Sequence, residues 1–336
     1  MQETPLDQAA RTVLSRYAVV GPQANIVALG NRGGFSGARL WSVRTEADAF
    51  CLKAWPPGDP SPDRLRWIHH LMRLARNQGL PFVPAVSETR GRSTSVHHAG
   101  RLWELTTWMP GAANFHADST AEKLRAACAA VAHLHRVWAR VDPLAGPCPA
   151  VQRRYERARE WLEWTEGGWQ PPLDQSPAPE LPPWTARAWT LLPAGVRYVS
   201  RVLQPWIDRR LPLQPCLCDV WHDHVLFTNN EVTGLIDYGA VKIDHVAVDL
   251  ARLLGSMIAD DTVLRDIGLR AYGQLRPLSP EEQELVVHLD RTGTIIGMAN
   301  WLKWLYRDRK RFDDYQAVAA RLADLVQRVE RWSVSA

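Results

Sequence analysis

The stretch that decides the fold is "CLCDVWHDHVLF" at residues 216–227, followed by "GLIDYG" at residues 234–239. Its centre places two carboxylates and two histidines within six positions: Asp219, His222, Asp223 and His224. Such a cluster is typical of a metal site, a catalytic loop or a polar turn. The apolar runs "VLF" and "GLI" flank a turn and predict a hairpin. We expect this hairpin to bring Asp219, His224 and Asp237 together at one end.

Composition limits the class of protein. A chain of 336 residues exceeds the roughly 250–300 residues at which single cores stop growing, so we expect two lobes. Hydrophobic residues make up 46% and charged residues 23%, which is ordinary for a globular protein. The net charge is +4, and basic and acidic residues are interspersed along the chain. This pattern argues against a nucleic-acid partner.

Neither membrane insertion nor secretion is expected. No run approaches the about 20 apolar residues that a transmembrane helix requires. The first residues, "MQETPLDQAARTVLSRY", lack the basic and then apolar layout of a secretory signal. The five cysteines form no CxxC pair, which predicts reduced thiols. We therefore expect a cytoplasmic protein with no membrane partner.

The chain changes character near residue 110. Residues 1–110 read as β-strands with one helix, predicted over 62–78 by apolar spacing that ends at Gly79. Residues 111–336 read as mostly helical, apart from the hairpin. The predicted fold class is α+β: a small β-rich lobe (1–110) and a larger, mostly helical lobe (111–336).

Two features of the first lobe suggest phosphate binding. The segment "GNRGGFSGARLW" (30–41) places four glycines between two strands. It is either a tight hairpin or a loop whose amides approach an anion. Lys53 lies on the strand "AFCLKAW", in a chain where only five of 40 basic residues are lysines. A lysine there either extends to solvent or faces a phosphate, and its scarcity favours the phosphate.

Asp219 and Asp237 match the needs of phosphoryl transfer, which uses a carboxylate to orient the attacking hydroxyl and ligands for Mg²⁺. Together, the glycine loop, the strand lysine, "DVWHDHVLF" and "GLIDYG" resemble the aminoglycoside phosphotransferase family. That family is a branch of the protein-kinase-like fold that includes choline and homoserine kinases. "WMPGAA" (108–113), "VAHLHRVW" (131–138) and "VAVDLARLLGS" (246–256) extend the resemblance over nearly the whole chain. It implies an ATP-dependent kinase acting on a small-molecule hydroxyl, with residues 1–110 as the nucleotide-binding lobe and residues 111–336 as the catalytic and acceptor-binding lobe.

The resemblance also implies a role for individual residues. The loop 30–37, with Gly33, Gly34 and Ser36, would cover the phosphates of ATP, and Lys53 would pair with the α- and β-phosphates. The stretch 104–107, with Glu104 and Thr106, would bind adenine through its backbone. Asp219 would be the catalytic carboxylate. Asp237 would hold Mg²⁺, with His224 as a second ligand and Mn²⁺ as an alternative metal. Asp249 would hold the catalytic loop through backbone amides.

Two departures from the family pattern favour an alternative. The motif "H-G-D-x-x-x-x-N" is changed at Leu217, Cys218 and His224. Imidazole suits Mg²⁺ less well than an amide oxygen does. In addition, the helix glutamate that should hold Lys53 is missing, and Asp63 is the only acid on that helix. A nucleotide-binding pseudoenzyme with a sensing or scaffolding role is therefore the alternative. A metal-dependent hydrolase built on "WHDH" is a weaker one.

Charge also bears on the acceptor. Residues 256–336 contain 12 acidic and 12 basic side chains, and a site for a polycation requires an acidic excess. We therefore expect a neutral or anionic hydroxyl acceptor, such as a sugar, an amino alcohol or a homoserine-like acid, and not an aminoglycoside.

Overall fold

The computed structural model describes residues 4–30, 37–141 and 143–334, and it contains two compact units. Unit 1 comprises Met1–Trp138 and Val220–Val241, and unit 2 comprises Ala139–Asp219 and Lys242–Ala336. Compactness thus groups the hairpin 225–235 with the N-terminal residues. The division into lobes 1–110 and 111–336, which rests on sequence pattern, stays a prediction.

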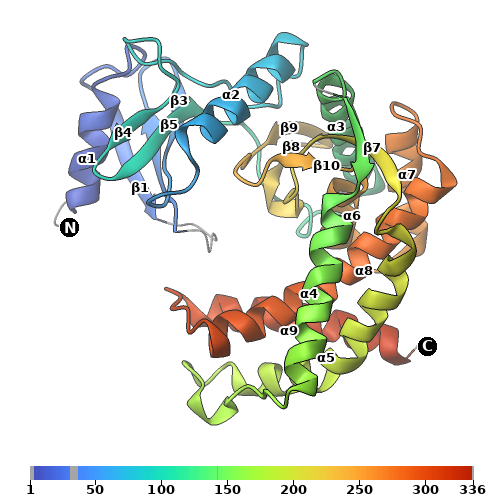
Figure 1. Ribbon diagram of the computed structural model, residues 1–336. Coiled ribbons are helices and arrows are strands. Elements are labelled where there is room, and N and C mark those ends of the chain that lie inside the picture. Colours follow the sequence, from blue (N-terminus) through green and yellow to red (C-terminus); the bar gives the residue numbers. More distant parts are fainter. Residues whose placement is uncertain (1–3, 31–36, 142, 335–336) are drawn as a thin grey trace. The chain divides into compact units, whose positions relative to one another are not determined.

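Unit 1 is built on a five-stranded antiparallel sheet of order β1-β2-β3-β5-β4 (Figure 1). A separate hairpin, β8–β9, belongs to the same unit. The elements of unit 1 are α1 (Pro5–Leu14), β1 (Asn25–Gly30), β2 (Arg39–Arg44), β3 (Ala49–Ala54), α2 (Pro62–Asn77), β4 (Val96–His98), β5 (Arg101–Thr107), α3 (Ala121–Trp138), the 3₁₀ turn His222–His224, β8 (Val225–Thr228) and β9 (Glu231–Leu235).

Helix α1 corrects the prediction of a single helix in the first 110 residues. Thr4 and Asp7 form a capping box and Pro5 occupies the first turn, a combination that starts helices. The helix then buries Ala9, Val13 and Leu14 against the sheet. Its apolar face is short, and burial against the sheet stabilises it more than its own propensity does.

The two faces of the central strands differ in chemistry. Alternate residues of a strand point to opposite faces. Leu52 of β3 and Leu105 of β5 lie in the core with α1. The opposite positions carry polar side chains: Lys53 of β3, and Glu104 and Thr106 of β5. The predicted nucleotide-binding side chains of these strands therefore share one face.

Unit 2 is mainly helical, and α4, α5, α8 and α9 pack on one another (Figure 1). Its strands form a three-stranded antiparallel sheet of order β10-β7-β6. The elements are β6 (Leu144–Pro147), α4 (Pro149–Glu166), a 3₁₀ turn (Leu173–Gln175), α5 (Pro182–Leu203), a 3₁₀ turn (Gln204–Trp206), β7 (Arg210–Cys216), β10 (Lys242–Asp244), α6 (Ala247–Ile258), α7 (Thr262–Gly273), α8 (Pro280–Leu302), a π-helical turn (Lys303–Arg307) and α9 (Tyr315–Val334). Within the described ranges, no helix combines the length and apolarity needed to cross a bilayer.

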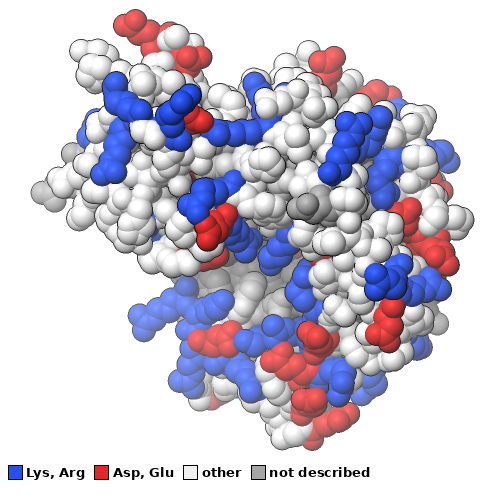
Figure 2. All heavy atoms as spheres, turned by 45° about the horizontal axis from the view of Figure 1, so that its top comes forward, with Lys and Arg blue, Asp and Glu red and all other residues white. Residues whose placement is uncertain are grey.

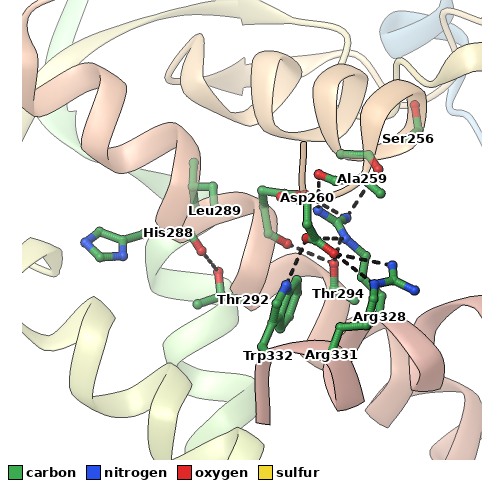
Figure 3. Close-up of polar contacts among 12 residues, drawn as sticks. Ser256, Ala259, Asp260, His288, Leu289, Thr292, Thr294, Arg328, Arg331 and Trp332 are labelled. Atoms are coloured by element: carbon green, nitrogen blue, oxygen red, sulfur yellow. Dashed lines mark hydrogen bonds and ion pairs between the residues drawn. The ribbon is translucent and has the colours of Figure 1, made fainter. Parts of the chain in front are cut away.

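One buried cation ties three segments of unit 2 together. Arg328 of α9 donates to both carboxylate oxygens of Asp290 on α8, at 3.0 and 2.5 Å. It also donates to Asp260 at 3.1 Å and to the carbonyl of Ala259 at 2.8 Å, just after α6 (Figure 3). Gly255 permits this approach, because a Cβ there would lie 2.0 Å from Asp290 Oδ1. The guanidinium thereby fixes α9 to α8 and to the residues that directly follow α6.

Candidate active site

The glycine-rich segment lies only partly within the described residues. Gly33, Gly34 and Ser36 fall outside them. The flanking strands β1 and β2 pair antiparallel, with Gly30 opposite Leu40 at the end of the ladder. The segment therefore connects two neighbouring strands, and its role over the phosphates stays a prediction.

The Lys53 side chain is mostly buried and faces an acid. Its Nζ donates to Oδ1 of Asp237 at 2.9 Å, although the two residues are 184 positions apart. The same Nζ lies 3.8 Å from the ring centre of Trp55, within cation–π range. The lysine is therefore held by a carboxylate and an aromatic ring, and it does not extend to solvent.

Lys53 and Asp237 each stabilise the charged form of the other. Burial lowers the pKa of Lys53, but the negative charges of Asp237 and Glu104 outweigh it and leave that pKa above its ordinary value. The positive charge of Lys53 holds the pKa of Asp237 well below its usual range, against the opposing effect of burial. Both groups are thus fully charged at neutral pH, as a phosphate ligand and a metal ligand need to be.

Helix α2 supplies no acid to Lys53. The carboxylate of Asp63 binds Arg66 in the first turn, and its side chain is 87% exposed. In the middle of the helix, His69 contacts Glu104 of β5, with Nε2 and Oε2 separated by 2.5 Å. Asp63 therefore does not replace the missing glutamate, and the polar link from α2 to the sheet runs through a histidine.

Glu104 and Thr106 lie in the interior of the sheet. They face Lys53 and Cys51 across the β3–β5 ladder. On the other edge of β5, the carbonyl of Leu105 accepts from Ser87 N at 2.8 Å, and Thr107 N donates to Ala85 O at 2.9 Å. Backbone groups on both edges of this stretch thus take part in sheet pairing. Its contact with adenine stays a prediction.

The hairpin brings His224 and Asp237 together, as the sequence predicts. Nε2 of His224 lies 3.9 Å from Oδ2 of Asp237. Asp237 adopts a φ of +60°, in the left-handed region. Its Oδ1 accepts from Gly239 N at 3.3 Å in addition to Lys53. The segment after β9 thus presents the carboxylate through a strained backbone, a conformation often found at functional positions.

The side chains of this hairpin fit a metal ion unequally. Asp237 offers an ionised carboxylate that is 47% exposed, which suits Mg²⁺. His224 is already engaged, because the indole N–H of Trp221 donates to its Nε2 at 2.8 Å. Binding through that nitrogen requires Trp221 to release it. Asp237 therefore presents a partly exposed carboxylate to a metal, whereas Nε2 of His224 is occupied.

The "WHDH" segment shows no three-ligand cluster of its own. His222 lies beside the ring of His116 at 4.2 Å between centroids, and its Nε2 is 3.4 Å from Asp223 Oδ1. Among the described residues, no group of three close His, Cys, Asp or Glu ligands includes His222, Asp223 or His224. The hydrolase interpretation gains no support from this arrangement.

In unit 2, a buried acid organises the loop that carries Asp219. Asp249 of α6 accepts from the backbone N–H of Leu217 at 2.7 Å and from that of Cys218 at 2.6 Å. Cys218 has a φ of +63°, so the chain turns sharply just before Asp219. These bonds confirm the role predicted for Asp249.

Asp219 itself is paired with Arg252, a cation that lies on α6 together with Asp249. Arg252 Nε donates to Oδ1 of Asp219 at 2.9 Å. Asp219 belongs to unit 2 and Asp237 to unit 1, so their predicted convergence stays a prediction. Sequence reasoning did not assign Arg252, although its spacing of three from Asp249 places both on one side of a helix. It also missed the pairing of His69 and the contact of Trp221.

Comparisons with known proteins agree with the phosphotransferase resemblance seen in the sequence. The sequence model described as "Phosphotransferase enzyme family" matches residues 28–285. A homoserine kinase from Polaromonas naphthalenivorans (strain CJ2) is 25% identical over 297 residues, covering 87% of this chain and 85% of that protein. Among solved structures, a spectinomycin phosphotransferase in complex with ADP and spectinomycin gives a TM-score of 0.65 at 12% identity, over 97% of this chain and 98% of that one.

A microcompartment-associated aminopropanol kinase gives a TM-score of 0.62 at 16% identity, over 98% of each chain. At such low identity, these structural likenesses concern the fold. They confirm the predicted α+β, kinase-like class, in which an N-terminal antiparallel sheet precedes a helical part.

Proposed function

The chain belongs to the phosphotransferase enzyme family, and from this premise we propose that it transfers the γ-phosphate of ATP to a hydroxyl of a small, carboxylate-bearing acceptor of the homoserine type. Membership confirms the resemblance seen in the sequence and makes the chain a small-molecule kinase. The observation that carries the proposal is the Lys53–Asp237 ion pair. It joins the two charged groups that a nucleotide and its metal require.

In this proposal each residue has one chemical task. Lys53 binds the α- and β-phosphates of ATP. Asp219 orients the acceptor hydroxyl and accepts its proton. As the acceptor oxygen forms a bond to the γ-phosphorus, the bond from that phosphorus to the β,γ-bridging oxygen breaks, and ADP leaves. Asp249 keeps Asp219 in place by fixing the two amides that precede it.

A divalent cation is part of the proposed reaction, and Asp237 would hold it, with His224 as a second ligand once Trp221 releases the imidazole. Bound Mg²⁺ or Mn²⁺ supplies neutralisation of the charge that develops on the transferred group. The protein's own contribution is an ionised carboxylate. Lys53 and the N–H of Gly239 hold that carboxylate from one side.

Charge near Asp219 supports an anionic acceptor. Arg252 lies against Asp219, and a guanidinium is well suited to bind a carboxylate through paired N–H donors. Residues 256–336 carry equal numbers of acidic and basic side chains, and Figure 2 shows side chains of both signs on the face that it draws. The homoserine kinase relative is named for an acceptor that carries both a hydroxyl and a carboxylate. We therefore assign the acceptor carboxylate to Arg252.

A nucleotide-binding protein without turnover is the second candidate. The observation that favours it is the bond from Trp221 to Nε2 of His224, since it occupies the predicted second metal ligand. In either case, free thiols at all five cysteines agree with the cytoplasmic location expected from the sequence, which stays a prediction.

One set of measurements tests the proposed function and its acceptor. ADP release is followed with homoserine, with 1-amino-2-propanol, which lacks the carboxylate, and with kanamycin, each in Mg²⁺ and in Mn²⁺. Homoserine is expected to give the highest kcat/KM, and Asp219→Asn to lower kcat by about 10³-fold. Arg252→Met should raise the KM for homoserine about tenfold, while the low activity with aminopropanol stays unchanged.

Three results would count against these assignments. Equal rates with kanamycin and homoserine would refute an anionic acceptor. Unchanged kinetics in Arg252→Met would refute the carboxylate contact. A rise in the melting temperature with ATP and metal, while no compound of the panel gives ADP release, would favour the pseudoenzyme over the kinase.

A further inference from the structure

Lys53 has an acidic neighbour besides Asp237, and it comes from β5. Glu104 is directly opposite Lys53 in the antiparallel ladder. Residues opposite each other in such a ladder project to the same face, with Cβ atoms about 4.5–5.5 Å apart. The negative charge of Glu104 contributes to the raised pKa of Lys53. The lysine is therefore flanked by one acid from the hairpin segment and one from the sheet.

Glu104 is held in place by helix α2. A carboxylate in the protein interior needs hydrogen-bond donors. His69 provides one, and the two side chains are only 1% and 9% exposed. A carboxylate oxygen only accepts, so Nε2 of His69 is the donor in their 2.5 Å contact. The bond joins the middle of α2 to the strand next to Lys53.

The charge of Glu104 reaches several buried groups around this position. It raises the pKa of Tyr17, where burial is the larger cause. It also acts on Cys51 of β3: burial raises the pKa of that thiol to about 12, Lys53 lowers it, and Glu104 adds a further rise. Tyr17 lies in the core with Leu52, on the other side of the sheet's strands. Cys51 and Lys53 instead share the face of Glu104. Glu104 is thus the anion that β5 contributes to this polar face.

We propose that Glu104 is a positioning residue for Lys53, with His69 as its anchor, and that this pair replaces the missing helix glutamate. In this arrangement the acid stands on the strand and the helix supplies the base that holds it. The inference rests on the proposed function, because it assigns Lys53 to the phosphates of ATP.

The pair has a specific task when nucleotide and metal bind. The ion pair with Asp237 must then give way, because Asp237 turns to the metal and Lys53 to the phosphates. Glu104 cannot leave in the same manner, since His69 and its burial fix it. It therefore keeps an anion beside the ammonium group in both states. This keeps Lys53 on the polar face of the sheet, where the proposed function places the phosphates.

The first test is Glu104→Gln, which preserves shape and a hydrogen bond to His69 but removes the charge. We expect the KM for ATP to rise about tenfold, the scale of one charge interaction in a partly buried site, while the KM for the acceptor changes less than twofold. Glu88→Gln is the matched control. Glu88 pairs with Arg73 of the same helix at 2.8 Å but is far more exposed, so ATP kinetics should not change.

The second test moves the acid onto the helix. In His69→Glu/Glu104→Gln, α2 itself presents a carboxylate beside the polar face, and the KM for ATP should return to within about threefold of wild type. A purely structural pair predicts the opposite, since the double variant should be at least as defective as the single one. The double variant also decides the matter if Glu104→Gln fails to fold.

Binding separates this inference from the proposed function. The Kd for ATP with Mg²⁺ is measured by calorimetry alongside turnover. If the wild-type protein bound ATP without turnover, the proposed kinase activity would be refuted. The Kd values of the variants would still test whether Glu104 positions Lys53. An unchanged Kd and KM in Glu104→Gln, or a double variant without recovery, would overturn the role of Glu104.

Discussion

Asp237 in unit 1 and Asp249 in unit 2 are both predicted site residues, but the protein holds them in opposite ways. Asp237 is bound mainly by other side chains, Lys53 and, at longer range, His224. It is about half exposed. Asp249 is fully buried and accepts from two backbone amides. A nucleotide and a metal can displace the partners of Asp237, whereas nothing in the proposed reaction replaces the amides bound to Asp249.

The difference separates a residue that takes part in the proposed reaction from a residue that holds the chain in place. An ion pair between side chains is suited to exchange, because each group keeps its charge when a phosphate or a metal takes the partner's place. A carboxylate bound to amides fixes the chain itself, and here the fixed chain leads directly into Asp219. Changes at Asp237 should therefore appear mainly in turnover, and changes at Asp249 mainly in stability.

The largest effect is expected at Asp237. Asp237→Asn keeps the shape and removes the charge that attracts the metal and Lys53. We predict that kcat falls by about 10³-fold or more, corresponding to several kcal/mol of lost transition-state stabilisation. The free energy of unfolding should also fall, because Lys53 loses a charged partner, but by less than in Asp249→Ala. The measurement is ADP release with the best acceptor, beside urea unfolding.

Asp223→Asn is the matched control, since its carboxylate is similarly exposed and lies 3.4 Å from Nε2 of His222. Its kcat should stay within about twofold of wild type. An Asp237→Asn protein with a tenth or more of wild-type turnover would contradict the assignment of Asp237.

At Asp249 the order of effects should reverse. Asp249→Ala leaves the amides of Leu217 and Cys218 buried without an acceptor. The free energy of unfolding should fall by about 3–5 kcal/mol, the scale for breaking a buried charged network. Asp249→Asn keeps one acceptor oxygen, and we expect about half of that loss. Urea titrations of the three proteins give the values, and equal stability of all three would remove the contrast with Asp237.

The same contrast explains which contacts were predictable from the sequence. The Asp249 contacts were predictable because the segment 246–256 resembles a helix of the aminoglycoside phosphotransferase family, and that resemblance implied the bonds to the backbone amides before Asp219. Lys53 was identifiable from its rarity and its place on a strand. The His224–Asp237 approach follows from the geometry of a short hairpin, where residues at the two open ends are neighbours.

Other contacts depend on the packing of elements that no local pattern relates. The His69–Glu104 bond joins residues 35 positions apart, and it requires the rotation of α2 on the sheet, which spacing alone does not fix. Helix α1 was missed because its apolar face is short and only the sheet stabilises it. No local pattern pointed to Trp221, and its role as a donor to His224 appears only in three dimensions.

A smaller effect concerns acid stability in unit 2. Burial raises the pKa of Glu282, but hydrogen bonds with His245 and with the N–H of Ser279, and the charge of Arg276, bring it down to about 2. A depressed pKa adds stability above the unfolded value of about 4.5 and loses it as the pH falls toward 2. Glu282→Gln should therefore remove about 2–3 kcal/mol at pH 7 and flatten the decline between pH 4.5 and 2.

Glu281→Gln is the matched control for this titration. Glu281 is the preceding residue, its side chain is 63% exposed, and it lies 3.3 Å from Arg209. Its loss should change stability by less than about 0.5 kcal/mol at any pH. If Glu282→Gln kept the wild-type slope in acid, the Glu282 carboxylate would not be a group that sets the acid stability of unit 2.

The smallest effect tests how closely unit 1 fits around Asp237. A Cβ at Gly239 would lie 2.9 Å from Cη2 of Trp55 and 3.2 Å from Oδ1 of Asp237. Gly239→Ala should thus push the loop away from the ring that Lys53 contacts, at a cost of about 1–2 kcal/mol for overpacking. We expect a KM for ATP about fivefold higher. Gly273→Ala, where a Cβ meets nothing within 4 Å, should leave kinetics unchanged, so similar kinetics in the two variants would show that the Trp55 contact does not shape the site.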